Sequence, residues 1–550
     1  MTGSERAAPA QAGAVWWRDA VFYQIYVRSF ADADGDGLGD LRGIVSRLPH
    51  VRELGADAVW LTPFYVSPQH DAGYDVADPC SVDPRFGTLA DFDALVDAAH
   101  GLGLRVVVDI VPNHTSWAHD WFRAALDAAP GSPERARYIF REGRGPAGDE
   151  PPNNWQSVFG GPAWTRATEP DGTPGEWYLH LFDQSQPDLN WRNPEVGDMF
   201  ESVLRFWLDR GVDGFRIDVA HSLFKEESLR DQVRTHEVVA GQTLDEDGGM
   251  VTPHEDDEPM WDQPEVHDVY RRWHRVLAEY PGDRMTVAEA WTKTPESMAR
   301  FVRPDELSQS FNFAWLAAPW SARAFARVIE STVAALEPVG ASATWVLENH
   351  DVIRVVTRYG GGEVGLARAR AAALAMLALP GSAYLYQGQE LGLGQVDVPP
   401  AARQDPLWFR TGEVGRDGCR VPVPWSGDEP PFGFGSGEGQ PWLPQPDEWV
   451  DLTVEAQSGD PDSTLSLFRR ALELRRTVAL SSGDEVVVHP VVDEVLCFDR
   501  GKLRVVVNCS QAPVPLPPGE ILLASGPLTA DQLRPTRRSG CAEPVAQPDG

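Results

Sequence analysis

Acidic side chains recur at the ends of short apolar runs in this chain. Asp109 lies in RVVVDI, Asp218 follows GFRI, and Glu289 follows MTVA. Carboxylates inside apolar segments are costly unless they are paired or functional. Two of them on neighbouring strands can hydrolyse a glycosidic bond with retention, because one attacks the anomeric carbon and the other protonates the leaving oxygen. Side-chain alternation puts Arg216 on the same strand face as Asp218, so its charge would favour an ionised nucleophile, and the apolar neighbours of Glu289 favour a neutral acid.

These side chains need a scaffold that brings separate strand ends together. Apolar runs typical of buried strands cover 21–30, 56–64, 105–113, 214–220, 285–290, 343–351 and 382–388. Amphipathic segments such as 89–103 and 199–211 lie between them, and each ends in Gly, as helices often do. Strand and helix alternating seven or eight times predict an α/β fold, the closed (β/α)8 barrel. In such a barrel the carboxyl ends of the strands share one rim, where we expect the acids to converge.

Three parts of the chain do not follow the strand–helix alternation. The interval after the third predicted strand is too long for a βα loop and is rich in Pro, Gly and Trp, which indicates an inserted subdomain. Short β-like runs follow the last predicted helix, 463–480. The predicted domains are a catalytic barrel over 15–113 and 186–480, an inserted subdomain over 114–185 and a C-terminal antiparallel β domain over 481–550. Two long polar segments, 240–265 and 396–450, are expected to extend over the same rim.

The charge and the hydropathy of the chain exclude some classes of partner. Asp and Glu number 82 against 48 Lys and Arg, so the formal net charge is −34. A surface of this sign repels nucleic acid. No apolar stretch reaches the roughly 18 residues that cross a bilayer, and the N-terminal sequence lacks the apolar core of a signal peptide. We therefore expect a cytoplasmic protein that binds neither nucleic acid nor membrane.

Four ordered motifs resemble the α-amylase superfamily of glycoside hydrolases, family 13. They are DIVPNHTS (109–116), GFRIDVAHS (214–222), VAEAW (287–291) and LENHD (347–351). QPDLN (186–190) is similar to the α-glucosidase and oligo-1,6-glucosidase branch. The resemblance covers nearly the whole chain and implies the same barrel, inserted domain and C-terminal β domain. It also implies that Asp218 is the nucleophile, Glu289 the general acid/base and Asp351 the stabiliser of the transition state.

The resemblance further implies a set of sugar-binding residues. DAGYDVADP (71–79) matches the D-x-G-Y-D element of the family, in which Tyr74 would stack on glucose and Asp71 would bind hydroxyl groups at the closed end of a pocket. Arg420 lies where the family has R-T-P, but Val421 replaces the threonine here, which leaves its sugar contact open. The predicted substrate-binding residues are Asp71, Tyr74, His114, Arg216, His350, Arg354 and Arg420. Arg354 would join Asp71 and Tyr74 in closing the pocket.

DADGDGLGD (32–40) is a candidate metal site. Its carboxylates alternate with small residues, and hard cations such as Ca²⁺ take about six to eight oxygen ligands. It is no EF-hand, because the twelfth position counted from Asp32 is Gly43. The resembling glucosidases hold Ca²⁺ or Mg²⁺ in this loop, which implies a structural site formed by Asp32, Asp34, Asp36, Leu38 and Asp40. The alternative is a solvated acidic turn.

The resemblance leaves several functions to compare. The first is a retaining, exo-acting α-glucosidase that releases glucose from maltose and short α-glucosides through a covalent intermediate. The second is an α-glucosyltransferase or disaccharide isomerase, similar to trehalose synthase, because no motif decides between water and sugar as acceptor. An endo-acting amylase fits QPDLN and D-x-G-Y-D poorly, and a non-catalytic transporter subunit would have lost the acids. In the family, Val after the nucleophile, here Val219, accompanies α-1,6 linkages, but Ala220-His221-Ser222 departs from that pattern, so we expect α-1,4 activity with tolerance of α-1,6 linkages.

Overall fold

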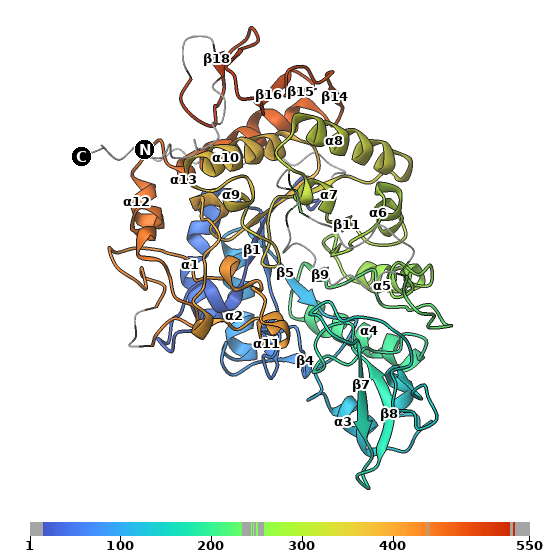
Figure 1. Cartoon of the computed structure of the whole chain (residues 1–550). Coiled ribbons are helices and arrows are strands. Elements are labelled where there is room, and N and C mark those ends of the chain that lie inside the picture. Colours follow the sequence, from blue (N-terminus) through green and yellow to red (C-terminus); the bar gives the residue numbers. More distant parts are fainter. Residues whose placement is uncertain are drawn as a thin grey trace, which may run out of the picture.

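Eight parallel strands form the centre of the molecule. The computed structural model describes residues 15–233, 244, 246, 249–250, 258–435, 437, 439–528 and 532–533. The strands are β1 (Val21–Ile25), β2 (Ala58–Leu61), β5 (Arg105–Ile110), β9 (Gly214–Ile217), β10 (Met285–Ala288), β11 (Gln309–Ser310), β12 (Thr344–Val346) and β13 (Ser382–Tyr386). Their order is β11-β10-β9-β5-β2-β1-β13-β12, and the N–H of Asn312 donates to the carbonyl of Thr344 at 3.0 Å across the remaining gap. The predicted (β/α)8 barrel is confirmed (Figure 1).

Helices surround this barrel, and their first residues follow local sequence signals. The main ones are α1 (Leu41–Leu54), α2 (Leu89–Gly101), α4 (Pro194–Asp209), α5 (Val266–Ala278), α8 (Ala322–Leu336), α10 (Gly362–Ala378) and α13 (Thr464–Leu474). Shorter ones are α6 (Pro295–Phe301), α7 (Phe313–Ala317), α9 (Val355–Arg358), α11 (Pro406–Thr411) and α12 (Val454–Ser458). Thr88 and Asp91 form a capping box that begins α2, and α4 begins with Pro directly after its cap Asn193. The observed strands are shorter than the apolar runs: 21–30 divides into β1 and a 3₁₀ turn, Val27–Ser29.

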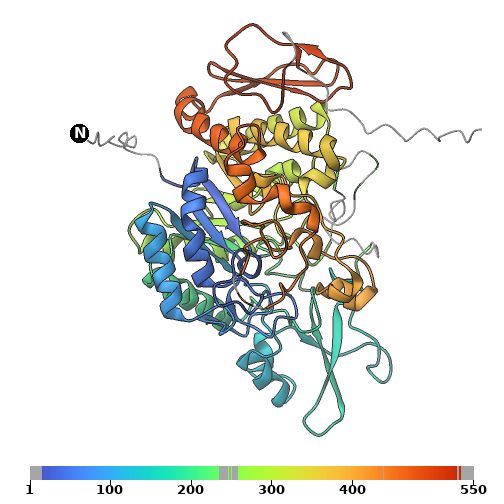
Figure 2. The same ribbon diagram turned by 90° about the vertical axis from the view of Figure 1, so that its left-hand side faces the viewer.

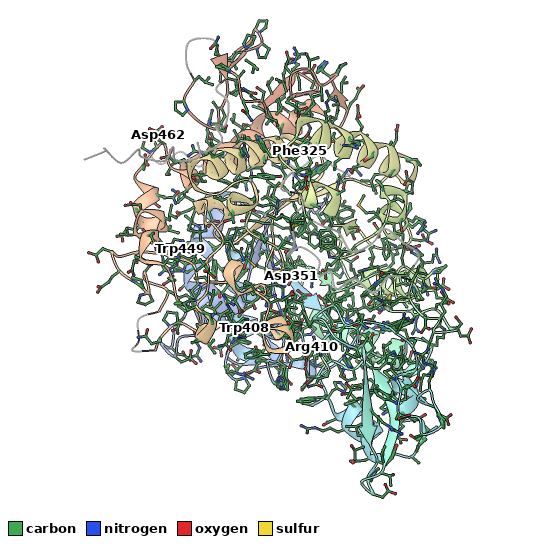
Figure 3. All side chains as sticks on the ribbon, viewed as in Figure 1. Phe325, Asp351, Trp408, Arg410, Trp449 and Asp462 are labelled. Atoms are coloured by element: carbon green, nitrogen blue, oxygen red, sulfur yellow. The ribbon has the colours of Figure 1, made fainter. Side chains whose placement is uncertain are left out.

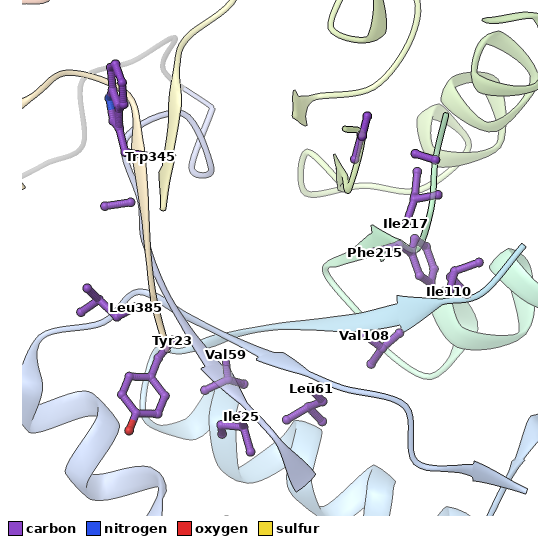
Figure 4. Close-up of a cluster of buried hydrophobic side chains, with 14 of the residues drawn as sticks. Tyr23, Ile25, Val59, Leu61, Val108, Ile110, Phe215, Ile217, Trp345 and Leu385 are labelled. Carbon is purple, nitrogen blue, oxygen red and sulfur yellow. The ribbon is translucent and has the colours of Figure 1, made fainter. Parts of the chain in front are cut away.

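Alternation along each strand separates two cores. On β5, Val107 packs inside the barrel with Phe22, Trp60 and Tyr384, whereas Val108 packs in the layer between the strands and the helices. Figure 4 shows members of this outer layer, among them Ile25, Val59, Leu61 and Val108. Side chains at alternate positions therefore face the barrel interior, and those nearest the carboxyl ends reach the rim.

The inserted subdomain and the C-terminal β domain lie at opposite ends of the molecule (Figures 1 and 2). The subdomain contains α3 (Asp120–Asp127) and a sheet of β6 (Phe140–Arg141), β7 (Trp164–Thr168) and β8 (Pro174–Leu179) in the order β6-β8-β7. The C-terminal domain pairs β14 (Val486–Val488), β15 (Val495–Arg500) and β16 (Leu503–Asn508) antiparallel, and β17 (Val514–Pro515) pairs with β18 (Gln532–Leu533). Near the barrel rim, β3 (Tyr65–Val66) and β4 (Asp78–Val82) pair antiparallel.

The two long segments expected at the rim differ in how much of them the structure describes. Most of 240–265 lies outside the described residues. Almost all of 396–450 is described; it contains α11, and Gly435 forms a β-bridge with Asp32. Among the described residues, no helix is both long enough and apolar enough to cross a membrane.

Candidate active site

Arg216 connects three carboxylates that come from three neighbouring strands. The register of β9 sets Arg216 beside Asp109 of β5 and beside Val287 of β10. Its Nη1 donates to Asp109 Oδ1 at 2.9 Å and to Asp218 Oδ1 at 2.6 Å, and its Nη2 donates to Glu289 Oε2 at 2.6 Å. The guanidinium is fully buried. The predicted convergence of Asp218 and Glu289 at one rim is therefore present, and adjacent nitrogens of a single guanidinium hold the two carboxyl groups.

Burial has a larger effect than Arg216 on the pKa of Asp218, contrary to the expectation from the sequence. Burial raises the pKa of Asp218, and the charges of Glu289 and Asp109 raise it further, while Arg216 acts in the opposite direction. Burial likewise raises the pKa of Asp109 to about 7. One guanidinium pairs with three buried carboxylates, so the proton affinities of these groups depend on one another. Arg216 favours ionised Asp218 as predicted but does not outweigh burial.

Glu289 has more polar surroundings than its apolar sequence neighbours indicate. In addition to Arg216, the backbone N–H of Val219 donates to its Oε2 at 3.0 Å. Val219 has a φ of 43°, an unusual value for a β-branched residue, and this conformation accompanies the contact of its N–H with Glu289. The expected apolar environment is therefore wrong for Oε2. Both donors hold this oxygen, which leaves Oε1 as the atom able to carry the proton of a general acid.

Asp351 lies near the centre of the molecule in Figure 3, and two arginines hold it. Its Oδ1 accepts from Arg416 Nη1 at 3.0 Å and from Arg420 Nη2 at 2.9 Å, and its Oδ2 is 3.2 Å from His350 Nε2. Burial opposes its ionisation, but the neighbouring positive charges hold the pKa of Asp351 well below its usual value. Burial also lowers the pKa of His350, so this ring is neutral. Gln24 Nε2 lies 2.7 Å from its Nδ1, which places the His350 proton on Nε2, facing Asp351.

Asp71 and its partners form one buried end of the site. Asp71 Oδ1 accepts from Arg416 Nη2 at 2.7 Å, and its Oδ2 accepts from Gln186 Nε2 at 3.1 Å. The same Gln186 nitrogen lies 3.0 Å from His114 Nε2. Burial raises the pKa of Asp71 to about 6 and lowers that of His114 to about 4. The Tyr74 hydroxyl donates to Asp109 Oδ2 at 3.1 Å, and this connects the buried end to the carboxylate cluster.

Two predicted arginines contact protein groups in this structure. Arg354 donates to the carbonyls of Gln387 at 2.8 Å and Cys419 at 2.9 Å and forms an ion pair with Glu348. The guanidinium of Arg354 is thus occupied by protein acceptors, and Arg416 instead occupies the expected position beside Asp71. The Arg420 side chain donates to Asp351 and to the carbonyl of His350. Of the five residues in RDGCR, the sequence argument selected only the last arginine, although the first one bridges Asp71 and Asp351.

Comparison with known proteins agrees with this geometry. Residues 24–483 match the family described as alpha amylase, catalytic domain. The chain belongs to the alpha-amylase family. Residues 476–542 match a domain of unknown function, DUF3459, which covers the C-terminal β domain. The protein is accordingly a glycoside hydrolase of family 13, and its eight-stranded barrel agrees with membership of this family.

The relatives of this alpha-amylase family member act on different glucosides. A probable alpha-glucosidase of Rhizobium meliloti (strain 1021) is 39% identical over 85% of this chain and 84% of its own length. An oligo-1,6-glucosidase of Parageobacillus thermoglucosidasius is 34% identical over 88% of this chain and 86% of its own. The crystal structure of an alpha-glucosyl transfer enzyme, XgtA, superposes with a TM-score of 0.82 at 36% identity, covering 95% of this chain and 98% of that one. The names of these relatives refer to hydrolysis or transfer of α-glucosyl groups in those proteins.

The acidic loop of this family member gathers three of its four carboxylates. Oxygens of Asp32, Asp34 and Asp40 lie within 4.8 Å of one another. Asp36 is not part of this group, and its Oδ1 accepts the N–H of Leu38 at 2.8 Å. Asp32 also accepts the N–H groups of Gly35 and Gly37, and burial raises its pKa. Three converging carboxylates fit a hard cation such as Ca²⁺ or Mg²⁺, with Asp36 outside the carboxylate group.

Proposed function

We propose that this glycoside hydrolase is a retaining, exo-acting α-glucosidase that releases terminal glucose from maltose and other short α-glucosides. The observation that carries the proposal is the Asp71–Arg416 ion pair, which joins Gln186 and His114 at one end of the site. Asp71 and Arg416 are both buried, with exposed fractions of 3% and 8%. Polar groups in this position fit the hydroxyls of a single terminal sugar.

The arrangement of the acids supports a two-step reaction. Asp218 attacks the anomeric carbon and forms a glucosyl–enzyme ester, while Glu289 gives its Oε1 proton to the leaving oxygen. Water then attacks the ester, Glu289 takes its proton, and glucose leaves with the original anomeric configuration. Ionised Asp351 stabilises the positive charge that develops on the sugar ring. Arg216 holds both Asp218 and Glu289 and keeps them on the same side of the barrel rim.

The buried end of the site provides a physical reason for exo action. Asp71, Gln186 and His114 would bond to the hydroxyls of a non-reducing terminal glucose. A chain extended beyond that end would leave these buried groups without partners, and each loss costs roughly 1–3 kcal/mol. Short substrates should therefore react faster than long ones. The probable alpha-glucosidase of Rhizobium meliloti, 39% identical, supports the same assignment.

Two assays test this proposal. A maltooligosaccharide series, compared with starch, isomaltose, sucrose and trehalose, should give glucose as the sole early product, with rates that fall as the chain lengthens. Maltose or longer fragments released early from starch would indicate an open cleft. NMR should show α-glucose as the first anomer, and β-glucose would contradict retention.

A second candidate, an α-glucosyltransferase or disaccharide isomerase, is favoured by the likeness to the structure of XgtA. It uses the same covalent intermediate and differs only in the acceptor. Product analysis at high maltose concentration distinguishes the two. Two molecules of free glucose for each maltose consumed indicate hydrolysis, whereas new trisaccharides or isomeric disaccharides indicate transfer.

We also propose that Asp32, Asp34, Asp40 and the carbonyl of Leu38 bind a structural Ca²⁺ or Mg²⁺, which takes no part in the reaction.

A further inference from the structure

Arg416 contacts three carboxylates, and only two of them belong to the proposed sugar site. Its Nη1 and Nη2 donate to Asp351 and Asp71, while its Nε donates to Asp405 Oδ2 at 2.6 Å. The backbone N–H of Arg416 donates to the same oxygen at 3.1 Å. The side chain of Asp405 has no exposed surface, and its ion pair with Arg416 is the shortest of the three.

Asp405 is itself held in place from several directions. Its Oδ1 accepts the N–H of Leu407 at 2.9 Å, so Asp405 is the N-cap of α11. Its own N–H donates to Asp417 Oδ2 at 3.1 Å. At the other end of α11, Arg410 donates to the carbonyl of Gly160 and to Asp183 of the inserted subdomain. These contacts fix the position of the Asp405 carboxylate, which in turn accepts from the Nε of Arg416.

The backbone next to Arg416 lies very close to the side chain of Asp405. Gly415 precedes the arginine, and a Cβ atom at that position would lie 2.4 Å from the Asp405 carboxyl carbon. Only a residue without a side chain brings the two groups so near to each other. The Arg416 guanidinium also lies over the Phe159 ring at 4.8 Å. One face and the Nε edge of the guanidinium are thus in contact with Phe159 and Asp405, and its two terminal nitrogens donate to Asp71 and Asp351.

We propose that Asp405 is a positioning residue of the glycosidase reaction, which holds Arg416 in the orientation that contacts Asp71 and Asp351 together. This inference rests on the proposed function, because it assigns Asp71 to sugar binding and Asp351 to the transition state. Asp405 touches neither of them. It holds Arg416 at 2.6 Å, whereas its ion pair with Arg420 is much longer, at 3.9 Å. Its loss should therefore affect both binding and turnover.

Two substitutions separate this role from helix capping. Asp405→Ala removes both the N-cap and the acceptor of Arg416. Asp405→Ser keeps an N-cap oxygen for Leu407, since Ser and Asp cap about equally well, but it is uncharged and too short to replace the ion pair. We expect both variants to raise KM and lower kcat on maltose, with kcat/KM reduced roughly 10- to 100-fold. The Ser variant should melt at a higher temperature than the Ala variant. A Ser variant with wild-type kinetics would show that capping alone matters.

A double-mutant cycle tests whether the effect passes through Arg416. In an Arg416→Ala background, Asp405→Ser should change kcat/KM less than about twofold, because the group that it positions is gone. Equal losses in the two backgrounds would overturn the proposal. Ser463→Ala, which removes the N-cap of α13, is the control for helix capping and should lower the melting temperature without changing KM or kcat.

A crystal structure of the Asp405→Ser variant provides a test that needs no substrate. We expect the Arg416 contacts with Asp71 and Asp351, now 2.7 and 3.0 Å, to be lost or lengthened beyond hydrogen-bond range. If both contacts remain, Asp405 does not position Arg416. If instead the wild type releases no glucose from any α-glucoside, the proposed function fails, and this crystal structure still decides the role of Asp405.

Discussion

Asp71 should be retained for function at a cost to stability, and Asp71→Asn tests this trade-off. Asp71 is 3% exposed, and burial raises its pKa to about 6, compared with a usual value of 3.8. A folded-state pKa above the unfolded one means that the folded protein prefers the neutral acid. The resulting stabilisation is complete below pH 3.8 and disappears as the pH rises through about 6. Above that pH, the native state carries a buried charge that Arg416 compensates only partly.

The difference between pKa values of about 6 and 3.8 corresponds to about 3 kcal/mol, at about 1.36 kcal/mol for each tenfold change in the equilibrium. Asn has nearly the same shape as Asp but stays neutral. Asp71→Asn should therefore match wild-type stability near pH 4 and exceed it by up to about 3 kcal/mol at pH 7 and above. Its kcat/KM on maltose should fall about 100-fold, because Asn is a weaker acceptor for sugar hydroxyls and for Arg416.

Urea unfolding of both proteins between pH 4 and pH 8 measures this difference, and glucose release from maltose measures activity. A stability gap that grows with pH, together with a loss of activity, supports the reasoning. A variant that is less stable than the wild type at pH 7 would show that Asp71 is a net stabilising partner of Arg416. Asp75→Asn changes a neighbouring buried carboxylate that accepts from the Ser67 hydroxyl and from the N–H groups of His70 and Asp71. Because it contacts Asp71, it serves as a control for the stability measurement only.

Three further predictions follow from other parts of the site. Asp218→Asn should keep the native circular dichroism spectrum but lose several orders of magnitude in kcat, and more than about a tenth of wild-type activity would contradict its role as nucleophile. Chelation with EDTA should lower the melting temperature with little change in activity at moderate temperature, and an unchanged melting temperature without bound metal by elemental analysis would refute the metal site. Arg354→Gln should reduce stability more than it raises KM, whereas Arg416→Gln should do the reverse, and a larger KM increase for Arg354→Gln would return Arg354 to the pocket.

Most of the fold follows from the sequence because its signals are local. Apolar runs predicted seven of the eight barrel strands. The exception is β11, which contains only Gln309 and Ser310 and carries no apolar run. Its position depends on pairing with β10 on one side and on the Asn312 contact with Thr344 on the other. Such a strand is defined by its neighbours, so no local pattern reveals it.

Site residues in short sequence motifs could be predicted, whereas some of those in long loops could not. Asp218, Glu289 and Asp351 lie in short ordered motifs, and the strand register brings the first two to Arg216. Arg416 and Asp405 lie in a long loop without periodicity, where sequence spacing does not predict which arginine turns inward. The alternative chosen from the sequence, Arg354, has the same residue type but faces backbone carbonyls. Contacts between segments far apart in the sequence determine that Arg416, and not Arg354, lies beside Asp71.

Three arginines at the rim neutralise different carboxylates of the site. Burial opposes the ionisation of Asp351, but its contacts with His350, Arg416 and Arg420 hold its pKa low, so it is ionised throughout the physiological range. Arg216 instead shares a single charge among Asp109, Asp218 and Glu289, and burial raises the pKa of Asp109 to about 7. A retaining glycosidase needs an ionised nucleophile and a protonated acid close together. In the proposed reaction, Glu289 becomes ionised as it gives its proton to the leaving oxygen, while Asp218 loses its charge on forming the ester. Arg216, which contacts both, therefore faces the same total charge before and after this step.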